Sequence, residues 1–249
     1  MKVLHQKLCI ALVAIFEIAA CGNAGTSGNN VSEEAMREIN TEANFRDTVK
    51  PKQSIKFDFE NLETGNLPSG WSQFFTGVGG TDWKITDDNG NKVLGQLYTS
   101  NPNSHFNIVV NDTVNAKDVM LTVRLKGVSG RHDQGGGFVW RFIDKENYYI
   151  VRANPLEDNV VMYKVENGKR TDLPLVGKGK TYGVDVDKLG KGWNTLKIIV
   201  RSDLFTVYLN EKELFKVQDK TFTNSGKAGL WTKADAVTYF DDFEIQHYE

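Results

Sequence analysis

Cysteine is almost absent from this sequence. The only two cysteines are Cys9 and Cys21, and none follows in the rest of the chain. The body of the protein therefore cannot form an internal disulfide, a thiolate metal site or a cysteine nucleophile.

Proline and net charge are also low. The chain has 5 prolines, a formal net charge of −2 and no long basic run, so we expect no binding to nucleic acid. The glycine run Gly135-Gly136-Gly137 is not followed by the Gly-Lys-Ser/Thr of a phosphate loop, and we expect no organic cofactor. Hydrophobic residues make up 40% of the chain, which is enough for a sizeable core.

The N-terminus reads as an export signal. Lys2 and Lys7 precede a mostly apolar stretch, residues 8–20. That stretch is shorter than the ~20 residues of a membrane-spanning helix, and it fits the apolar region of a signal peptide. Glu17 is unusual inside such a stretch. We expect residues 1–20 to be a signal peptide.

The end of this signal resembles the lipobox of bacterial lipoproteins. Ile18-Ala19-Ala20-Cys21 matches the pattern in which the chain is cut before a cysteine that carries diacylglycerol. Gly22 follows where an aspartate would favour the inner membrane. The resemblance implies an exported protein of the bacterial envelope, lipidated at Cys21, in the outer membrane, with membrane contact only through the lipid anchor. An ordinary cleaved signal is the alternative.

The next segment has the composition of a tether. Residues 22–30 are rich in Gly, Asn and Ser, as in a flexible linker, and residues 31–47 have a weak helical pattern. We therefore divide the chain into residues 1–20, a lipidated tether over residues 21–50, and a folded domain over residues 51–249.

The folded domain is predicted to be all-β. Residues 55–60 and 119–125 alternate apolar and polar side chains, and turn signals such as Asn89-Gly90 and Asn167-Gly168 separate similar short stretches. No long helical period follows residue 50. The pattern predicts a two-sheet antiparallel jelly-roll sandwich of about 12–14 strands.

One hairpin can be predicted in register. Residues 137–143 and 148–154 flank a short turn, so that Ile143 would pair with Tyr148 and Arg141 with Ile150. One face then carries apolar residues only. The other carries Arg141 and Arg152 on diagonal positions ~7–8 Å apart, where both could reach one anionic or polyhydroxyl ligand. The alternative is that each arginine pairs with a carboxylate of the protein.

The domain resembles the concanavalin A-like lectin/glucanase superfamily, and specifically the laminin-G-like jelly rolls of exported bacterial proteins. The matching positions run in order along the domain: Phe57-Asp58-Phe59-Glu60, Gly70-Trp71, Trp83, residues 135–141, Asn147-Tyr148-Tyr149, Gly192-Trp193-Asn194, Val207-Tyr208-Leu209-Asn210, residues 226–231, and Phe240-Asp241-Asp242-Phe243. A more distant similarity is to 3-keto-disaccharide hydrolase domains.

The resemblance implies a fold but leaves the activity open. Laminarinase-type members carry a strand of the form Glu-x-Asp-x-x-Glu or Glu-x-Asp-x-Glu, and this sequence has no such strand. The resemblance also implies a structural Ca²⁺ shared by an acidic residue near the first strand and an aspartate near the last. Glu60 and Asp242 match those places. Two exposed carboxylates at strand ends are the alternative.

The concave sheet of the jelly roll is the expected glycan groove. Arginine and lysine donate to hydroxyls and carboxylates, and aromatic faces stack on sugar rings. The candidate groove residues are Arg141, Tyr148, Arg152, Tyr163, Trp231 and Lys233. Core packing is the alternative for the aromatic members. A lyase set of His132, Tyr148 and Arg141 is conceivable, although a solvated loop explains His132 more simply.

These observations predict an envelope-anchored carbohydrate-binding lipoprotein. An exported enzyme, either a glycoside hydrolase, a 3-keto-disaccharide hydrolase-like protein or a polysaccharide lyase, is the second interpretation. A structural or adhesive surface protein is the third.

Overall fold

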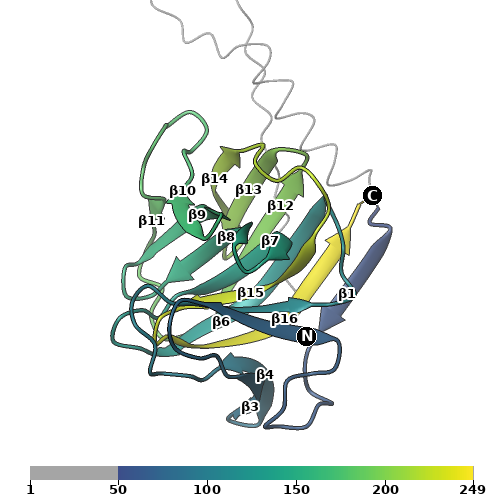
Figure 1. Ribbon diagram of the computed structural model, residues 1–249, viewed down its shortest axis with the longest axis vertical. Coiled ribbons are helices and arrows are strands. Elements are labelled where there is room, and N and C mark those ends of the chain that lie inside the picture. The colour runs from purple at the N-terminus through teal and green to yellow at the C-terminus, as the bar shows by residue number, and fades with distance from the viewer. Residues whose placement is uncertain (1–49, 249) are drawn as a thin grey trace, which may run out of the picture. The chain divides into compact units, whose positions relative to one another are not determined.

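A computed structural model describes residues 50–248 and contains strands but no helix in that range (Figure 1). No helix of the length and apolarity that a membrane span requires occurs in this range. The strands are β1 (Gln53–Phe57), β2 (Trp71–Thr76), β3 (Trp83–Asp88), β4 (Asn91–Gln96), β5 (Phe106–Asn111), β6 (Val119–Ser129), β7 (Gly136–Asp144), β8 (Asn147–Asn154), β9 (Asn159–Glu166), β10 (Lys169–Asp172), β11 (Val184–Asp185), β12 (Asn194–Arg201), β13 (Leu204–Leu209), β14 (Lys212–Gln218), β15 (Lys227–Lys233) and β16 (Val237–His247).

The strands form two antiparallel sheets. Sheet A has the order β14-β13-β12-β6-β16-β4-β3, with β1 also paired to β16. Sheet B has the order β10-β9-β8-β7-β15-β5-β2, with β11 also paired to β9. The predicted all-β sandwich is confirmed, with a few more strands than expected because β10 and β11 are very short.

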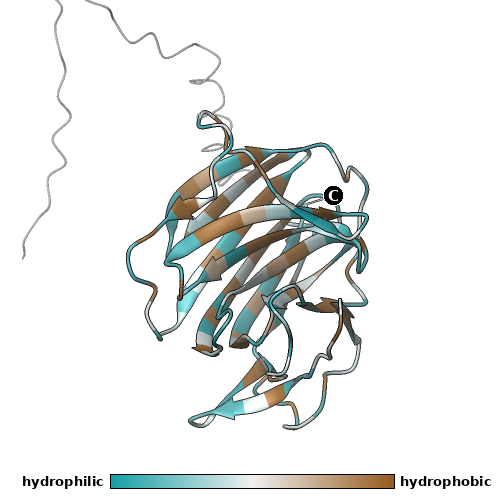
Figure 2. Cartoon of the chain, turned by 60° about the vertical axis from the view of Figure 1, so that its left-hand side comes forward, coloured by the Kyte–Doolittle hydropathy of each residue, from teal (hydrophilic) through white to brown (hydrophobic). Residues whose placement is uncertain are grey.

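Alternating side chains build the core between the sheets. Along β6, Leu121, Val123 and Leu125 are buried, and the residues between them are partly exposed. Figure 2 shows this alternation as changes of colour along single strands. Each such buried aliphatic side chain contributes about 1.5–3 kcal/mol to folding, so this core is the main source of stability.

Asn-Gly turns fix the register of two hairpins. Asn89 and Gly90 join β3 to β4, and Asn167 and Gly168 join β9 to β10, all four with positive φ. This is the type I′ geometry that matches the twist of the flanking strands. Both predicted turns are therefore confirmed.

Sheet B also buries the face that turns away from sheet A. In β8, Tyr149 and Val151 belong to the core between the sheets, whereas Tyr148 and Ile150 belong to a second apolar cluster. That second cluster comprises Phe106, Ile108, Val110, Val139, Phe142, Tyr148, Ile150, Val161, Tyr163, Val165 and Trp231. Since neighbouring residues of a strand point to opposite faces, the second cluster covers the face of sheet B opposite the core.

This face is concave, because side chains of distant strands meet across it. The rings of Phe74 on β2 and Phe142 on β7 lie 5.2 Å apart, although β5 and β15 separate these strands. The guanidinium of Arg170 on β10 lies 5.1 Å from the ring of Phe106 on β5. We call this surface the concave face of sheet B.

The β7–β8 hairpin departs from the predicted register. Ile150 pairs with Val139 rather than Arg141, and the pairing shifts between Trp140 and Asp144. Arg141 has a φ of 46° within this bulge. The prediction that Arg141 and Arg152 share one face is therefore wrong, since the extra residues of the bulge turn Phe142 onto the concave face and Arg141 away from it.

Arg141 is a buried structural residue. Its side chain is 1% exposed and donates to the backbone oxygens of Lys117 at 3.2 Å, Phe222 at 2.7 Å and Ser202. Asp118 lies 3.6 Å from the same guanidinium. One arginine thus joins three loops that are distant in the sequence.

Asp235 fixes the loop between β6 and β7. Its carboxylate accepts from the backbone N–H groups of Arg131 at 2.7 Å, His132 at 2.9 Å and Asp133 at 3.2 Å. Burial alone would raise the pKa of Asp235, but these hydrogen bonds outweigh it and lower the pKa. The loop in turn places Asp133, which pairs with Lys233 at 3.3 Å.

We expect Arg141→Ala to lower the free energy of unfolding by about 3 kcal/mol or more, because it leaves buried carbonyls without their donor and Asp118 without its cation. Urea denaturation measures the change. Arg131→Ala is the control, since its side chain is exposed and should change stability by less than about 0.5 kcal/mol. Equal effects of the two substitutions would contradict the structural role of Arg141.

We expect the stability that Asp235 contributes to disappear in acid. Its pKa is lower in the folded chain than in the unfolded one, so the contribution is complete above the unfolded value and is lost as the pH falls through the folded value. Urea denaturation between pH 7 and about pH 3 should therefore show a steeper loss for the wild type than for Asp235→Asn. If the free energy of unfolding falls equally with pH in both proteins, the charge of the Asp235 carboxylate does not contribute to stability.

Candidate functional site

Five of the six predicted groove residues lie on the concave face of sheet B. Tyr148, Tyr163 and Trp231 belong to its apolar cluster, and Arg152 hydrogen-bonds to Tyr163 within it. Lys233 pairs with Phe106 in the β15–β5 register and so shares its face. The sixth, Arg141, lies on the other side, as described above.

Arg152 is held by the protein. Its side chain is 3% exposed and donates to Asn159, to Glu157 at 2.7 Å, and to the hydroxyls of Tyr163 at 3.2 Å and Tyr182 at 3.3 Å. These acceptors bind the N–H groups of the Arg152 guanidinium on several sides. Arg152 therefore positions two tyrosines and has a carboxylate of its own.

The two tyrosines continue this network to the surface. The Tyr163 hydroxyl donates to the Tyr182 hydroxyl at 2.9 Å. Burial raises the pKa of Tyr163, so its hydroxyl stays protonated. Tyr182 lies between β10 and β11 and is 53% exposed, which makes its ring available at the rim of the concave face.

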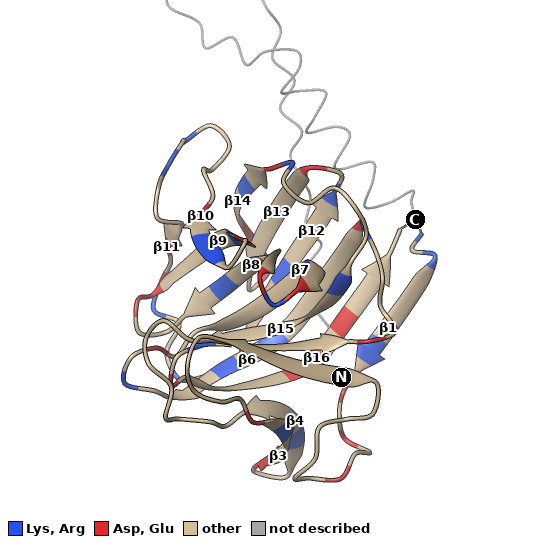
Figure 3. Ribbon diagram, in the orientation of Figure 1, with Lys and Arg blue, Asp and Glu red and all other residues tan. Residues whose placement is uncertain are grey.

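Arg170 has a different environment from Arg152. Its guanidinium lies 4.5 Å from the ring of Tyr163 and 5.1 Å from that of Phe106, in cation–π contacts. Within residues 50–248 it makes no hydrogen bond and no ion pair. The aromatic rings thus hold the Arg170 guanidinium in place, and its N–H donors have no acceptor among the described residues. Figure 3 shows the basic colour on β10 where it lies beside β9.

Two more donors lie on the same face. Trp231 packs its ring 5.5 Å from Phe106, and both Trp231 and Tyr148 are fully buried. Apart from each other, the indole Nε1 of Trp231 and the hydroxyl of Tyr148 have no hydrogen-bond partner in the part of the chain that the structure covers. Burial raises the pKa of Tyr148, so that its hydroxyl remains a donor.

Lys233 lies at the rim and is already paired. Its Nζ lies 2.6 Å from Asn103 Oδ1 and 3.3 Å from the buried carboxylate of Asp133. Its charge is therefore compensated by the protein, in contrast to that of Arg170.

The predicted calcium residues do not form a fitting donor set. Asp242 contacts Lys56 at 2.8 Å through one oxygen and Arg124 at 3.1 Å through the other. Burial would raise the pKa of Asp242, but these cations outweigh it and lower the pKa. Among the described residues no group of three or more His, Cys, Asp or Glu side chains could hold a metal ion. A calcium ion at Glu60 and Asp242 would have to displace both cations.

The conceivable lyase set is not assembled. Tyr148 lies on the concave face, whereas Arg141 lies on the opposite side of sheet B. His132 is exposed on the loop fixed by Asp235, and its ring Nε2 is 3.1 Å from Arg131.

The sequence interpretation missed Arg170, Tyr182 and Phe106. Arg170 had a usable signal, because the Asn167-Gly168 turn sets Arg170 opposite Val165, two residues from Tyr163 on the same face. Tyr182 lies on a long connection and had no such signal.

Comparisons with known proteins concern the fold. No protein-family model matches the chain, and a search of curated proteins finds no match. The solved structure of a carbohydrate-binding module, CBM66, from Bacillus subtilis is similar with a TM-score of 0.53 and 19% sequence identity, over 71% of this chain and 95% of that chain. A solved structure described as a native glycosidic hydrolase is similar with a TM-score of 0.52 and 14% identity, over 81% of this chain and 98% of that chain. The chain thus has the same two-sheet jelly-roll fold as these two structures.

Proposed function

We propose that this protein binds carbohydrate on the concave face of sheet B. The observation that carries the proposal is Arg170, a guanidinium stacked between Tyr163 and Phe106 with no acceptor in the described chain. A binding site typically combines aromatic walls with a few well-placed polar groups. A glycan supplies the acceptors that these donors lack.

Each residue of the proposed site has a distinct task. The exposed ring of Tyr182 offers a stacking surface for a sugar ring. Arg170 donates to ligand oxygens, and its planar group is pre-ordered by the two rings against which it packs. Arg152 does not bind the ligand but holds the hydroxyls of Tyr163 and Tyr182.

The fold supports the choice of ligand class. One of the solved structures with a similar fold is named a carbohydrate-binding module. Because this likeness is one of fold, the residues above carry the argument for this chain. The expected signal peptide and the expected lipidation site, Cys21, lie outside the described residues. As part of the proposal, they would tether the binding domain to the bacterial envelope.

We expect Arg170→Ala to weaken glycan binding at least about tenfold, the effect of losing one charge-assisted hydrogen bond. A glycan array of the protein identifies a ligand, and calorimetric titration measures its Kd for wild type and variant. Tyr182→Ala should also weaken binding, through the lost stacking surface.

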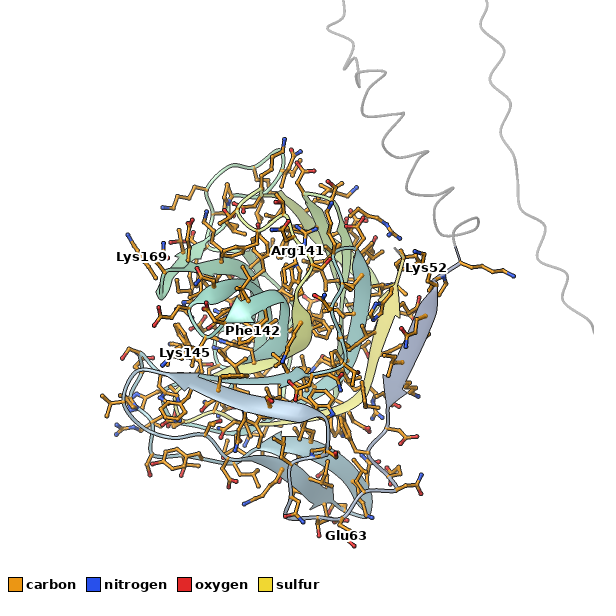
Figure 4. The ribbon with its side chains drawn as sticks, turned by 45° about the vertical axis from the view of Figure 1, so that its right-hand side comes forward. Lys52, Glu63, Arg141, Phe142, Lys145 and Lys169 are labelled. Carbon is orange, nitrogen blue, oxygen red and sulfur yellow. The ribbon has the colours of Figure 1, made fainter. Side chains whose placement is uncertain are left out.

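Lys52→Ala is the matched control. Lys52 is an exposed cation beside β1, on the other side of the domain from Lys169 in Figure 4. The Lys52→Ala variant should bind the glycan with the same Kd as the wild type. Equal Kd values for Arg170→Ala and wild type would exclude the concave face as the site, and turnover of the glycan would favour an enzyme.

A further inference from the structure

We infer that the glycan bound at this face is acidic, with a carboxylate that pairs with Arg170. The inference rests on the proposed function, since it names the class of sugar for the same site. The inference comes from the excess of positive charge and of hydrogen-bond donors around Arg170.

The first step compares Arg170 with other arginines of the domain. Arg124, Arg141 and Arg152 each lie within 4.0 Å of a carboxylate of the protein: Asp242, Asp118 and Glu157 respectively. Arg170 has aromatic rings in place of a carboxylate. The protein thus neutralises these three guanidinium groups and leaves Arg170 for a ligand.

The second step is the charge of the segment that carries Arg170. Residues 169–183 contain four cations, Lys169, Arg170, Lys178 and Lys180, and one carboxylate, Asp172. The side chains of the three lysines are exposed and make no hydrogen bond or ion pair with residues 50–248. Figure 3 shows basic residues in blue on the loop that leads from β10 to β11, and Figure 4 labels Lys169 at the surface.

The third step ties this segment to the site. Tyr182, near its end, hydrogen-bonds to Tyr163 and Arg152 on the concave face. Arg170, near its start, stacks on the same Tyr163. Both ends of the basic segment are therefore fixed beside one aromatic ring, so its field acts on a ligand at that face.

The fourth step concerns hydrogen bonding. Trp231 Nε1 and the Tyr148 hydroxyl are buried beside each other on this face with no other partner, so the Tyr148 O–H lacks an acceptor, in addition to the donors of Arg170. A neutral sugar hydroxyl brings a donor along with its acceptor oxygen, whereas a carboxylate brings acceptors only. A surplus of donors therefore favours an anionic ligand.

Asp172 is the one opposing charge of residues 169–183. It pairs with Tyr163 in the β9–β10 register and so shares the face of Arg170, two residues away. It forms no ion pair with Arg170. Asp172 should repel an acidic sugar, and Asp172→Asn should bind such a sugar more tightly.

The experiment compares each acidic glycan with its own uncharged form. Oligosaccharides of pectate, alginate and hyaluronan are titrated into the protein beside their methyl esters, which keep the sugar and remove the charge. We expect at least one acidic form to bind about tenfold or more tightly than its ester. That difference should shrink with added salt and in Arg170→Gln, but persist in Lys52→Gln.

The outcomes separate the inference from the proposed function. Equal affinity for acid and ester, or tight binding of neutral glycans alone, would overturn the acidic class while leaving glycan binding intact. No binding of any glycan would overturn both. Circular dichroism and urea denaturation of Arg170→Gln distinguish a lost contact from a lost fold.

Discussion

The curvature of sheet B is the constraint on which the rest of the molecule depends. A sandwich needs to bury only one face of each sheet, yet β8 buries Tyr149 and Val151 on one side and Tyr148 and Ile150 on the other. The second burial is possible because the sheet curls until Phe74 meets Phe142 and Arg170 meets Phe106. The proposed site is formed by residues that only this curvature brings together.

Three arginines of sheet B show how environment assigns a role. Arg141 donates to backbone carbonyls and ties loops together, and Arg152 positions tyrosines beside its own carboxylate. Arg170 is the one held by aromatic rings without an acceptor in residues 50–248. The same side chain is thus a structural clamp, a positioning group or a ligand-binding group, according to what the surrounding strands offer it.

The sequence predicted those features that depend on local chemistry. Alternation along β6 and the Asn-Gly turns after β3 and β9 depend on neighbouring residues, and both were predicted correctly. The bulge at Arg141 was not, because its stability comes from carbonyls of Lys117, Ser202 and Phe222, which no local pattern connects to β7. The partners of Asp242 are likewise distant, so the carboxylate expected to bind calcium pairs with Lys56 and Arg124 instead.

The central claim is that a glycan contacts Arg170 on the concave face. This contact can be observed directly by nuclear magnetic resonance of the arginine Nε–H groups. The spectra are recorded while an oligosaccharide ligand is titrated into the protein. The account predicts that the Arg170 resonance, displaced at the outset by the rings of Tyr163 and Phe106, shifts on binding while that of Arg124 on sheet A stays in place. A shift at Arg124 with Arg170 unchanged would contradict it.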